Sequence, residues 1–144
     1  MTNWLPEAPS TKRIAFGAEL LAEVSDVRSG YLALQSYLPD IRLDPQSSDF
    51  SYSINRPRTS QDLAVKINRL SRWGVVILLR FKMGVPSESV VLQAPDSQWT
   101  ACRLSLDINT DAAFSGELPH ERLAEILDNL IAFGQEIAAQ GDVP

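Results

Sequence analysis

The chain has 144 residues, a formal net charge of −5 and a single cysteine, and 44% of its residues are hydrophobic. This length suits one domain with a substantial core, and the composition is that of an ordinary globular protein. One cysteine excludes an intrachain disulfide and cysteine-built zinc sites. No apolar run is long enough to span a membrane and no secretory signal is visible, so the expected location is the cytoplasm.

Residues 1–10 contain two prolines and are predicted to form an extended lead-in to a single domain over residues 11–144. Residues 11–25 alternate like a strand, although alanine, leucine and glutamate in this stretch favour a helix. Of these two alternatives we favour the strand.

Residues 26–38 have apolar side chains at helical spacing, on one face formed by Val27, Tyr31, Leu34 and Leu38. Asp26 is a suitable cap for the start of this helix, and Pro39 is expected to end it. A connecting loop is predicted over residues 39–49.

Alternation of apolar and polar residues predicts five further strands, at residues 50–54, 65–69, 75–83, 90–93 and 100–108. We expect the strand over residues 75–83 to be the most buried, and a turn at Trp73 and Gly74 to lead into it. Its large apolar side chains would share one face: Val75, Ile77, Leu79, Phe81 and Met83. Short turns between consecutive strands imply an antiparallel meander.

Residues 119–140 show the clearest helical pattern of the chain. Pro119 suits the first helical position, and Gly141 suits a left-handed residue just past the end. The apolar stripe consists of Leu123, Ile126, Leu127, Leu130, Phe133, Gly134 and Ile137. Acidic residues occupy the opposite side.

The predicted fold is therefore α+β. A mainly antiparallel sheet of four to six strands would carry the early helix and the long C-terminal amphipathic helix on its apolar face. The stripe of the terminal helix is wide for one small sheet, and sheet edges need cover, so a homodimer or higher oligomer is expected.

The charges are unevenly distributed along the chain. Residues 56–82 hold seven basic residues against Asp62 alone, whereas residues 107–142 hold eight acids against Arg122 alone. One interpretation is that the two regions face each other in the fold or across a dimer. The other is a basic surface for an anionic partner, and the aromatic residues Tyr52 and Trp73 among the arginines are typical of nucleic-acid surfaces.

Candidate catalytic residues are few. The only histidine, His120, lies in the first turn of the acidic helix, where an exposed surface role is expected. Cys102 falls on the apolar face of its strand and is expected to act as a small hydrophobic residue. Nothing in the sequence brings the two together as a nucleophile and base, so we predict no catalytic residues.

The best metal-like pattern is Asp107, Asn109 and Asp111, which matches the opening of a calcium-binding EF-hand loop. The match then fails, because Ala112 stands where glycine is needed and Leu118 where a bidentate glutamate is needed. A strand-ending turn with local side-chain hydrogen bonds is the preferred interpretation. No phosphate-binding glycine loop is present, and we predict neither a metal nor a cofactor.

Four stretches, Phe50–Arg58, Ile67–Trp73, Leu104–Asn109 and Phe133–Ile137, together resemble a sporadically distributed bacterial family of unknown function. In that family a strand precedes a long terminal helix, and its build is similar to that of the export chaperone SecB. The resemblance implies an acidic, oligomeric sheet-and-helix protein that holds other proteins. It implies no role for any particular residue.

The preferred hypothesis for function is a small non-catalytic protein-binding module, chaperone-like or adaptor-like, that uses an apolar groove between sheet and helix. The alternatives are an immunity or antitoxin-type protein that neutralises a partner through its acidic C-terminal helix, and a nucleic-acid binder that uses residues 56–82. Another protein is the expected partner. The candidate partner-binding residues are Arg56, Arg58, Arg72, Trp73, Glu121, Glu125 and Asp128.

Overall fold

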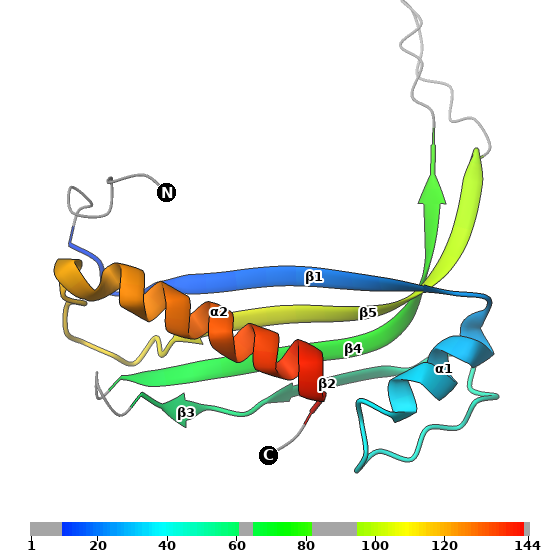
Figure 1. The fold of residues 1–144 in the computed structure, drawn as a ribbon, viewed down its shortest axis with the longest axis horizontal. Coiled ribbons are helices and arrows are strands. Elements are labelled where there is room, and N and C mark those ends of the chain that lie inside the picture. Colours follow the sequence, from blue (N-terminus) through cyan, green and yellow to red (C-terminus); the bar gives the residue numbers. More distant parts are fainter. Residues whose placement is uncertain (1–9, 61–64, 82–94, 143–144) are drawn as a thin grey trace, which may run out of the picture.

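Both helices lie on one face of an antiparallel sheet (Figure 1), as the predicted α+β fold requires. The computed structural model describes residues 10–60, 65–81 and 95–142, and these form five strands in one open sheet. The elements in chain order are β1 (Ala15–Val24), α1 (Val27–Gln35), β2 (Ser51–Asn55), β3 (Arg58–Thr59), β4 (Lys66–Arg80), β5 (Ser97–Thr110), the 3-10 turn η2 (His120–Arg122) and α2 (Leu123–Gln140).

The order of strands across the sheet is β1-β5-β4-β2, and β3 also pairs with β4. The predicted meander is correct for β2, β4 and β5 but wrong for β1, which pairs with the last strand. The connection between β1 and β2 consists of α1 and the residues after it (Figure 1). It is long enough to carry the chain from one edge of the sheet to the other, so β1 and β2 need not be neighbours.

The predicted turn at Trp73 and Gly74 is wrong, because both residues lie inside β4. Trp73 pairs with Tyr52 of β2 on one side and with Leu104 of β5 on the other. The glycine is needed for close approach of backbones: a Cβ atom on Gly74 would lie 3.2 Å from the carbonyl oxygen of Phe50. The two strands predicted at residues 65–69 and 75–83 are thus one 15-residue strand.

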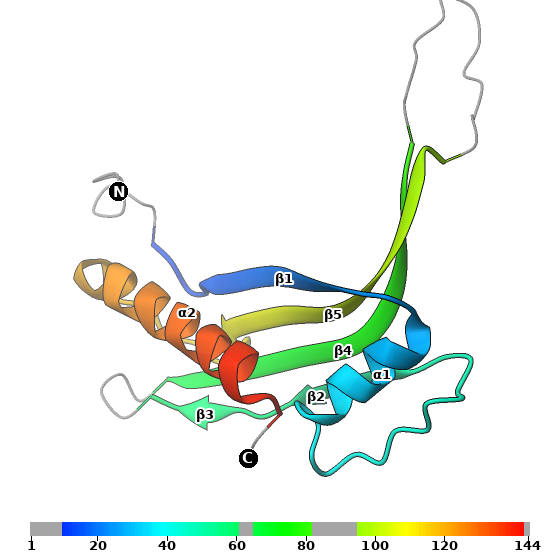
Figure 2. The same cartoon turned by 45° about the vertical axis from the view of Figure 1, so that its right-hand side comes forward.

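The prediction that residues 75–83 form the most buried strand is also wrong. Ile77 is 52% exposed, and Leu79 and Phe81 are each 46% exposed. Here β4 and β5 bend and leave the body of the protein, beyond the reach of either helix (Figure 2). The buried part of β4 is its first half, where Ile67 is fully buried and Trp73 nearly so. The predicted strand at residues 90–93 and Met83 lie outside the described residues.

The C-terminal helix packs its predicted stripe onto the sheet, with Leu123, Ile126, Leu130, Gly134 and Ile137 buried. Its start differs from the prediction, because η2 precedes it and α2 begins only at Leu123, four residues after Pro119. Its end is as predicted: Gly141 has a φ of 83°. No helix in the described part of the chain combines the length and apolarity needed to cross a bilayer.

The early helix begins as predicted, because the Asp26 carboxylate accepts a hydrogen bond of 2.7 Å from the N–H of Ser29. It ends at Gln35, three residues before the predicted end. The Gln35 side chain then organises the following loop: its Nε2 donates to the carbonyls of Leu38 and Ile41, and its Oε1 accepts from the N–H of Leu43. Leu38 and Leu43 are thereby held in the core.

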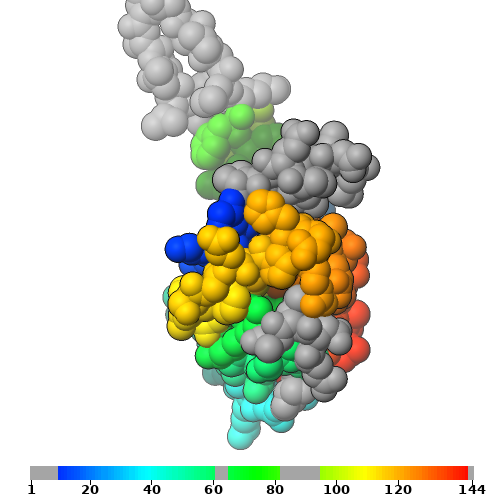
Figure 3. Space-filling model, turned by 90° about the vertical axis from the view of Figure 1, so that its left-hand side faces the viewer, coloured from blue at the N-terminus to red at the C-terminus, as the bar shows by residue number. Residues whose placement is uncertain are grey.

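At the other end of the sheet, residues 10–14, the connection after β5 and the start of α2 pack together (Figure 3). Thr11 and Leu118 form an isolated bridge there, with a hydrogen bond of 2.7 Å from the N–H of Leu118 to the carbonyl of Thr11. Val65, Leu118, Leu123 and Ile126 form a second buried cluster below this contact.

Candidate binding groove at the edge of the sheet

β1 is an edge strand, paired along one side with β5. The N–H of Thr110 donates to the carbonyl of Ile14 at 3.0 Å, in register with the pairing of β1 and β5. Since hydrogen-bonded and non-hydrogen-bonded pairs alternate in an antiparallel ladder, the even-numbered residues of β1 bond to β5. The odd-numbered residues from Ala15 to Glu23 therefore direct their N–H and C=O groups outward. No strand among the described residues pairs with this edge.

An apolar groove opens beside this edge, on the face of the sheet that carries the helices. Its volume is about 240 Å³. Its principal walls come from five elements or their ends: Leu20 and Ala22 from β1, Leu34 and Tyr37 from α1 and its end, Trp73 from β4, Cys102 and Leu104 from β5, and Ala138 from α2. Leu20 and Leu21 at its rim are 44% and 49% exposed.

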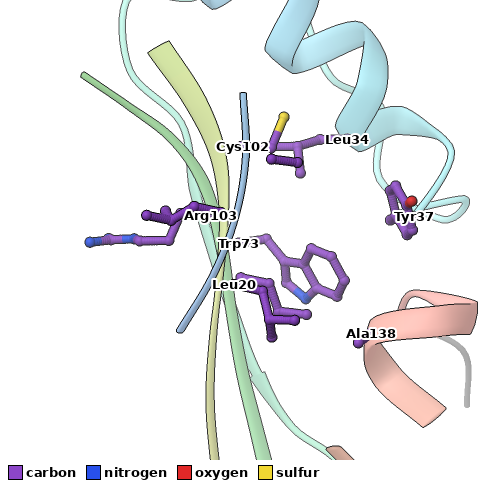
Figure 4. Close-up of a pocket in the computed structure, with 10 residues that line it drawn as sticks. Leu20, Leu34, Tyr37, Trp73, Cys102, Arg103 and Ala138 are labelled. Atoms are coloured by element: carbon purple, nitrogen blue, oxygen red, sulfur yellow. The ribbon is translucent and has the colours of Figure 1, made fainter. Parts of the chain in front are cut away.

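Trp73 forms the floor of the groove. Its indole N–H donates to the hydroxyl of Ser71 at 3.1 Å, and its ring stacks with that of Tyr37 at a centroid distance of 5.9 Å. Leu20 and Ala138 lie on the same side of the sheet as the indole, whereas Arg103 points to the opposite side (Figure 4). The floor of the groove is therefore apolar, because the indole N–H of Trp73 already has a hydrogen-bond partner within the fold.

The cysteine and the histidine are far apart. The Cys102 thiol donates to the carbonyl of Gly30 at 3.4 Å, and burial raises its pKa, which disfavours the nucleophilic thiolate. His120 is the first residue of η2, beyond the Thr110 end of β5. The strand between Cys102 and Thr110 alone spans about 26 Å at the usual rise per residue, so the two side chains do not form a dyad.

The metal-like pattern is divided between a strand and a turn. Asp107 and Asn109 lie within β5, where the Asn109 amide donates to the Asp107 carboxylate at 2.7 Å. Asp111 accepts from the N–H of Ala113 and forms an ion pair with Lys66, and these contacts lower its pKa. This is the predicted turn with local hydrogen bonds. The described residues contain no group of three or more side chains suited to hold a metal ion.

The basic and acidic regions face each other within the fold, as the first of the two interpretations predicted. Arg56 pairs with Asp142 at 2.7 Å, and Arg58 and Arg69 both pair with Glu136, at 3.0 and 3.2 Å. The Asp142 carboxylate also accepts from the Tyr52 hydroxyl, and its pKa is lowered, chiefly by Arg56.

The other candidate residues are dispersed. Arg72 alternates with Trp73 along β4, so the two side chains lie on opposite faces of the sheet, Arg72 exposed and Trp73 buried. The arginines of the basic stretch are thus divided between the two faces of the sheet. Glu121, Glu125 and Asp128 are exposed along the C-terminal helical segment, and Glu125 pairs with Arg122 at 2.9 Å.

Sequence reasoning placed Trp73 among the partner-binding residues but missed Leu20, Leu21 and Tyr37. Leu20 belonged to an ambiguous segment, and its importance depends on β1 being an edge strand, which the order of strands decides. Tyr37 was assigned to a helix that ends before it. The only signal for this groove in the sequence was the pair of adjacent leucines, Leu20 and Leu21, in a predicted strand.

Comparison of the chain with protein-family models, with curated proteins and with solved structures finds no match. The resemblance to a family with a SecB-like build therefore stays a prediction.

Proposed function

We propose that this chain is a small non-catalytic protein-binding module of the cytoplasm, chaperone-like or adaptor-like, that holds an extended apolar segment of another protein. The observation that carries this proposal is an edge strand, β1, whose outer side pairs with no other strand of the described residues, together with the apolar groove that opens beside it. The backbone of β1 would pair with the segment, and the groove would receive one of its apolar side chains.

In this mode of binding, the backbone of β1 supplies affinity and the groove supplies specificity. Main-chain hydrogen bonds to the odd-numbered residues of β1 are independent of the partner's sequence, whereas the groove selects for an apolar side chain. Because strand side chains alternate, Glu19 and Glu23 lie on the opposite face of β1 from Leu20. An added strand with apolar residues toward the groove and basic residues on the other face would satisfy both faces.

A second copy of this chain is a less suitable occupant of the edge. A symmetric antiparallel pairing centred on Leu21 would place Glu19 of one copy directly opposite Glu23 of the other, on the same face. Like charges at such positions destabilise strand pairing. We therefore favour a different protein as the partner, and sedimentation velocity of the purified chain would reveal self-association.

The test is direct binding of a permanently unfolded, carboxymethylated model protein, followed by fluorescence anisotropy. Leu21→Pro removes an outward N–H without breaking the ladder to β5, and Leu20→Lys places a charge at the groove. We expect both to weaken binding by at least about tenfold, or about 1.4 kcal/mol. Leu32→Lys, at a residue of α1 that is 58% exposed and away from the groove, is the matched control.

Leu21→Ala separates loss of the side chain from loss of the N–H. Far-UV circular dichroism and thermal melting establish that each variant is folded. If the unfolded protein binds the parent and the β1 variants equally, the edge is not the site and the proposal fails. If it does not bind the parent at all, the chaperone-like function itself is excluded.

A second candidate function is neutralisation of a basic partner by the acidic face of the C-terminal helix. The observation that favours it is the exposure of Glu121, Glu125 and Asp128. Charge reversal at these residues should then weaken binding to the partner that co-purifies with the tagged chain. Unchanged affinity would exclude this mechanism.

A further inference from the structure

At the edge of the sheet opposite β1, three arginines converge below the end of α2. Arg56 and Pro57 lie between β2 and β3, and Arg58 is the first residue of β3. The N–H of Arg56 donates to the carbonyl of Arg69 in β4 at 3.2 Å. All three lie on the helix-covered face. We call Arg56, Arg58 and Arg69 the arginine cluster. Together with Asn55 and Pro57 they line an open cavity of about 390 Å³.

The acids around the arginine cluster are unevenly shared. Arg56 has its own counter-ion, since Asp142 accepts from its Nε and its Nη2, and Asp40 acts on it at longer range. Arg58 and Arg69 share Glu136, whose Oε2 accepts from Arg58 Nη1 at 3.0 Å and from Arg69 Nη2 at 3.2 Å. Within the described part of the chain, one carboxylate thus serves two guanidinium groups beside the cavity.

Of the three arginines, Arg69 is the one most destabilised by the shortage of negative charge, because it is only 3% exposed. Its Nε is buried and has no hydrogen-bond partner among the residues that the structure describes, and burial together with Arg58 lowers its pKa. The ring of Phe133 lies 5.3 Å from its guanidinium and 5.9 Å from that of Arg58, which compensates part of this cost. A buried cation that lacks a full counter-ion is expensive, and an anion in the adjacent cavity would reduce that expense.

We propose that the arginine cluster binds a phosphoryl group in the cavity that it lines. Guanidinium groups match the oxygens of phosphate in a bidentate geometry, which a lysine cannot reproduce. Arg58, which is 39% exposed, makes the direct contacts together with Arg56. Arg69, enclosed behind them, contributes its charge. The cavity has room for a phosphate ester, carried either by a small metabolite or by a phosphorylated side chain of another protein.

The experiment follows the Nε–H resonance of Arg69 by proton–nitrogen correlation spectroscopy during titration with inorganic phosphate at constant ionic strength. Burial slows exchange of this proton and makes the resonance observable. We expect a saturable shift with phosphate and none with chloride. Arg58→Gln should abolish the shift, Arg58→Lys should restore only part of it, and Arg28→Gln on α1 should leave it unchanged.

The absence of a saturable shift up to about 20 mM phosphate, which corresponds to a binding free energy weaker than about −2.3 kcal/mol, would overturn the proposal. A shift of equal size in Arg58→Gln would overturn it as well. Ribose 5-phosphate and a phosphoserine peptide then identify the source of the phosphoryl group. The ester that binds more tightly than inorganic phosphate is the source of the phosphoryl group. Equal binding of inorganic phosphate, ribose 5-phosphate and the peptide indicates recognition of the phosphoryl group alone.

Discussion

The guanidinium of Arg56 donates two hydrogen bonds to the carboxylate of Asp142, from Nε at 2.7 Å and from Nη2 at 3.1 Å, across a sequence separation of 86 residues. The same carboxylate accepts from Tyr52, and the N–H of Asp142 donates to the carbonyl of Tyr37. Asp142, just after α2, thus connects the end of that helix to β2 and to the residues that follow α1.

Asp142→Asn is therefore expected to lower the free energy of unfolding at pH 7 by roughly 1–3 kcal/mol, because it weakens a charge-assisted pair that is largely buried. Asp49→Asn, at an exposed aspartate, is the control and should have little effect. Urea unfolding measures both. An Asp142→Asn variant as stable as the parent would show that the ion pair contributes nothing net.

The same pair predicts a pH dependence. The folded-state pKa of Asp142 is lowered, chiefly by Arg56, so its contribution to stability is complete above the unfolded pKa of about 3.9 and is lost as pH falls through the folded value. Below about pH 4 the parent should lose more stability than Asp142→Asn does. Parallel stability–pH curves for the two proteins would contradict this assignment.

Gly141→Ala should destabilise the chain by about 1–3 kcal/mol, because a φ of 83° strains an L-residue and the new Cβ would overlap the backbone of Tyr37. Gly17→Ala in β1 is the matched control, since its Cβ would meet nothing closer than the Leu106 carbonyl oxygen at 3.8 Å. Thermal melting of the two variants gives the comparison. Equal melting temperatures would exclude a special role for Gly141.

Gln35→Ala should cost roughly 1–3 kcal/mol, because it leaves two carbonyls and one N–H of the loop after α1 without their partner. Gln46→Ala, at an exposed glutamine of the same connection, should change stability by less than about 0.5 kcal/mol. Hydrogen exchange of the Leu43 N–H provides a local readout, since its protection should fall only in the first variant.

Truncation should destabilise the protein much more in the first half of β4 than in the second. Ile67→Ala, at a fully buried residue, is expected to cost about 2–5 kcal/mol, and Ile77→Ala, at a residue that is 52% exposed, less than about 1 kcal/mol. Chemical denaturation of both variants tests the finding that β4 leaves the core after Trp73. A large cost at Ile77 would mean that the projecting part of the hairpin packs against something in solution.

The sequence by itself determined the elements whose signals are local. The cap at Asp26, the stripe and final glycine of the C-terminal helix, and the alternation of Leu104, Leu106 and Ile108 all follow from rules that act over a few residues. The opposing charges of residues 56–82 and 107–142 left two interpretations open, and the ion pairs of Arg56, Arg58 and Arg69 in the structure decided that the two regions face each other.

Only the tertiary structure decided which faces are covered and which edges are free. Alternation shows that Ile77 and Trp73 lie on the same side of β4. The helices α1 and α2 cover that side at Trp73 but not at Ile77, so Trp73 is buried and Ile77 is exposed. The pairing of β1 with β5 makes β1 an edge strand, and this in turn makes Leu20 part of a groove. Strand order and helix placement are non-local, because they depend on how long connections cross the sheet.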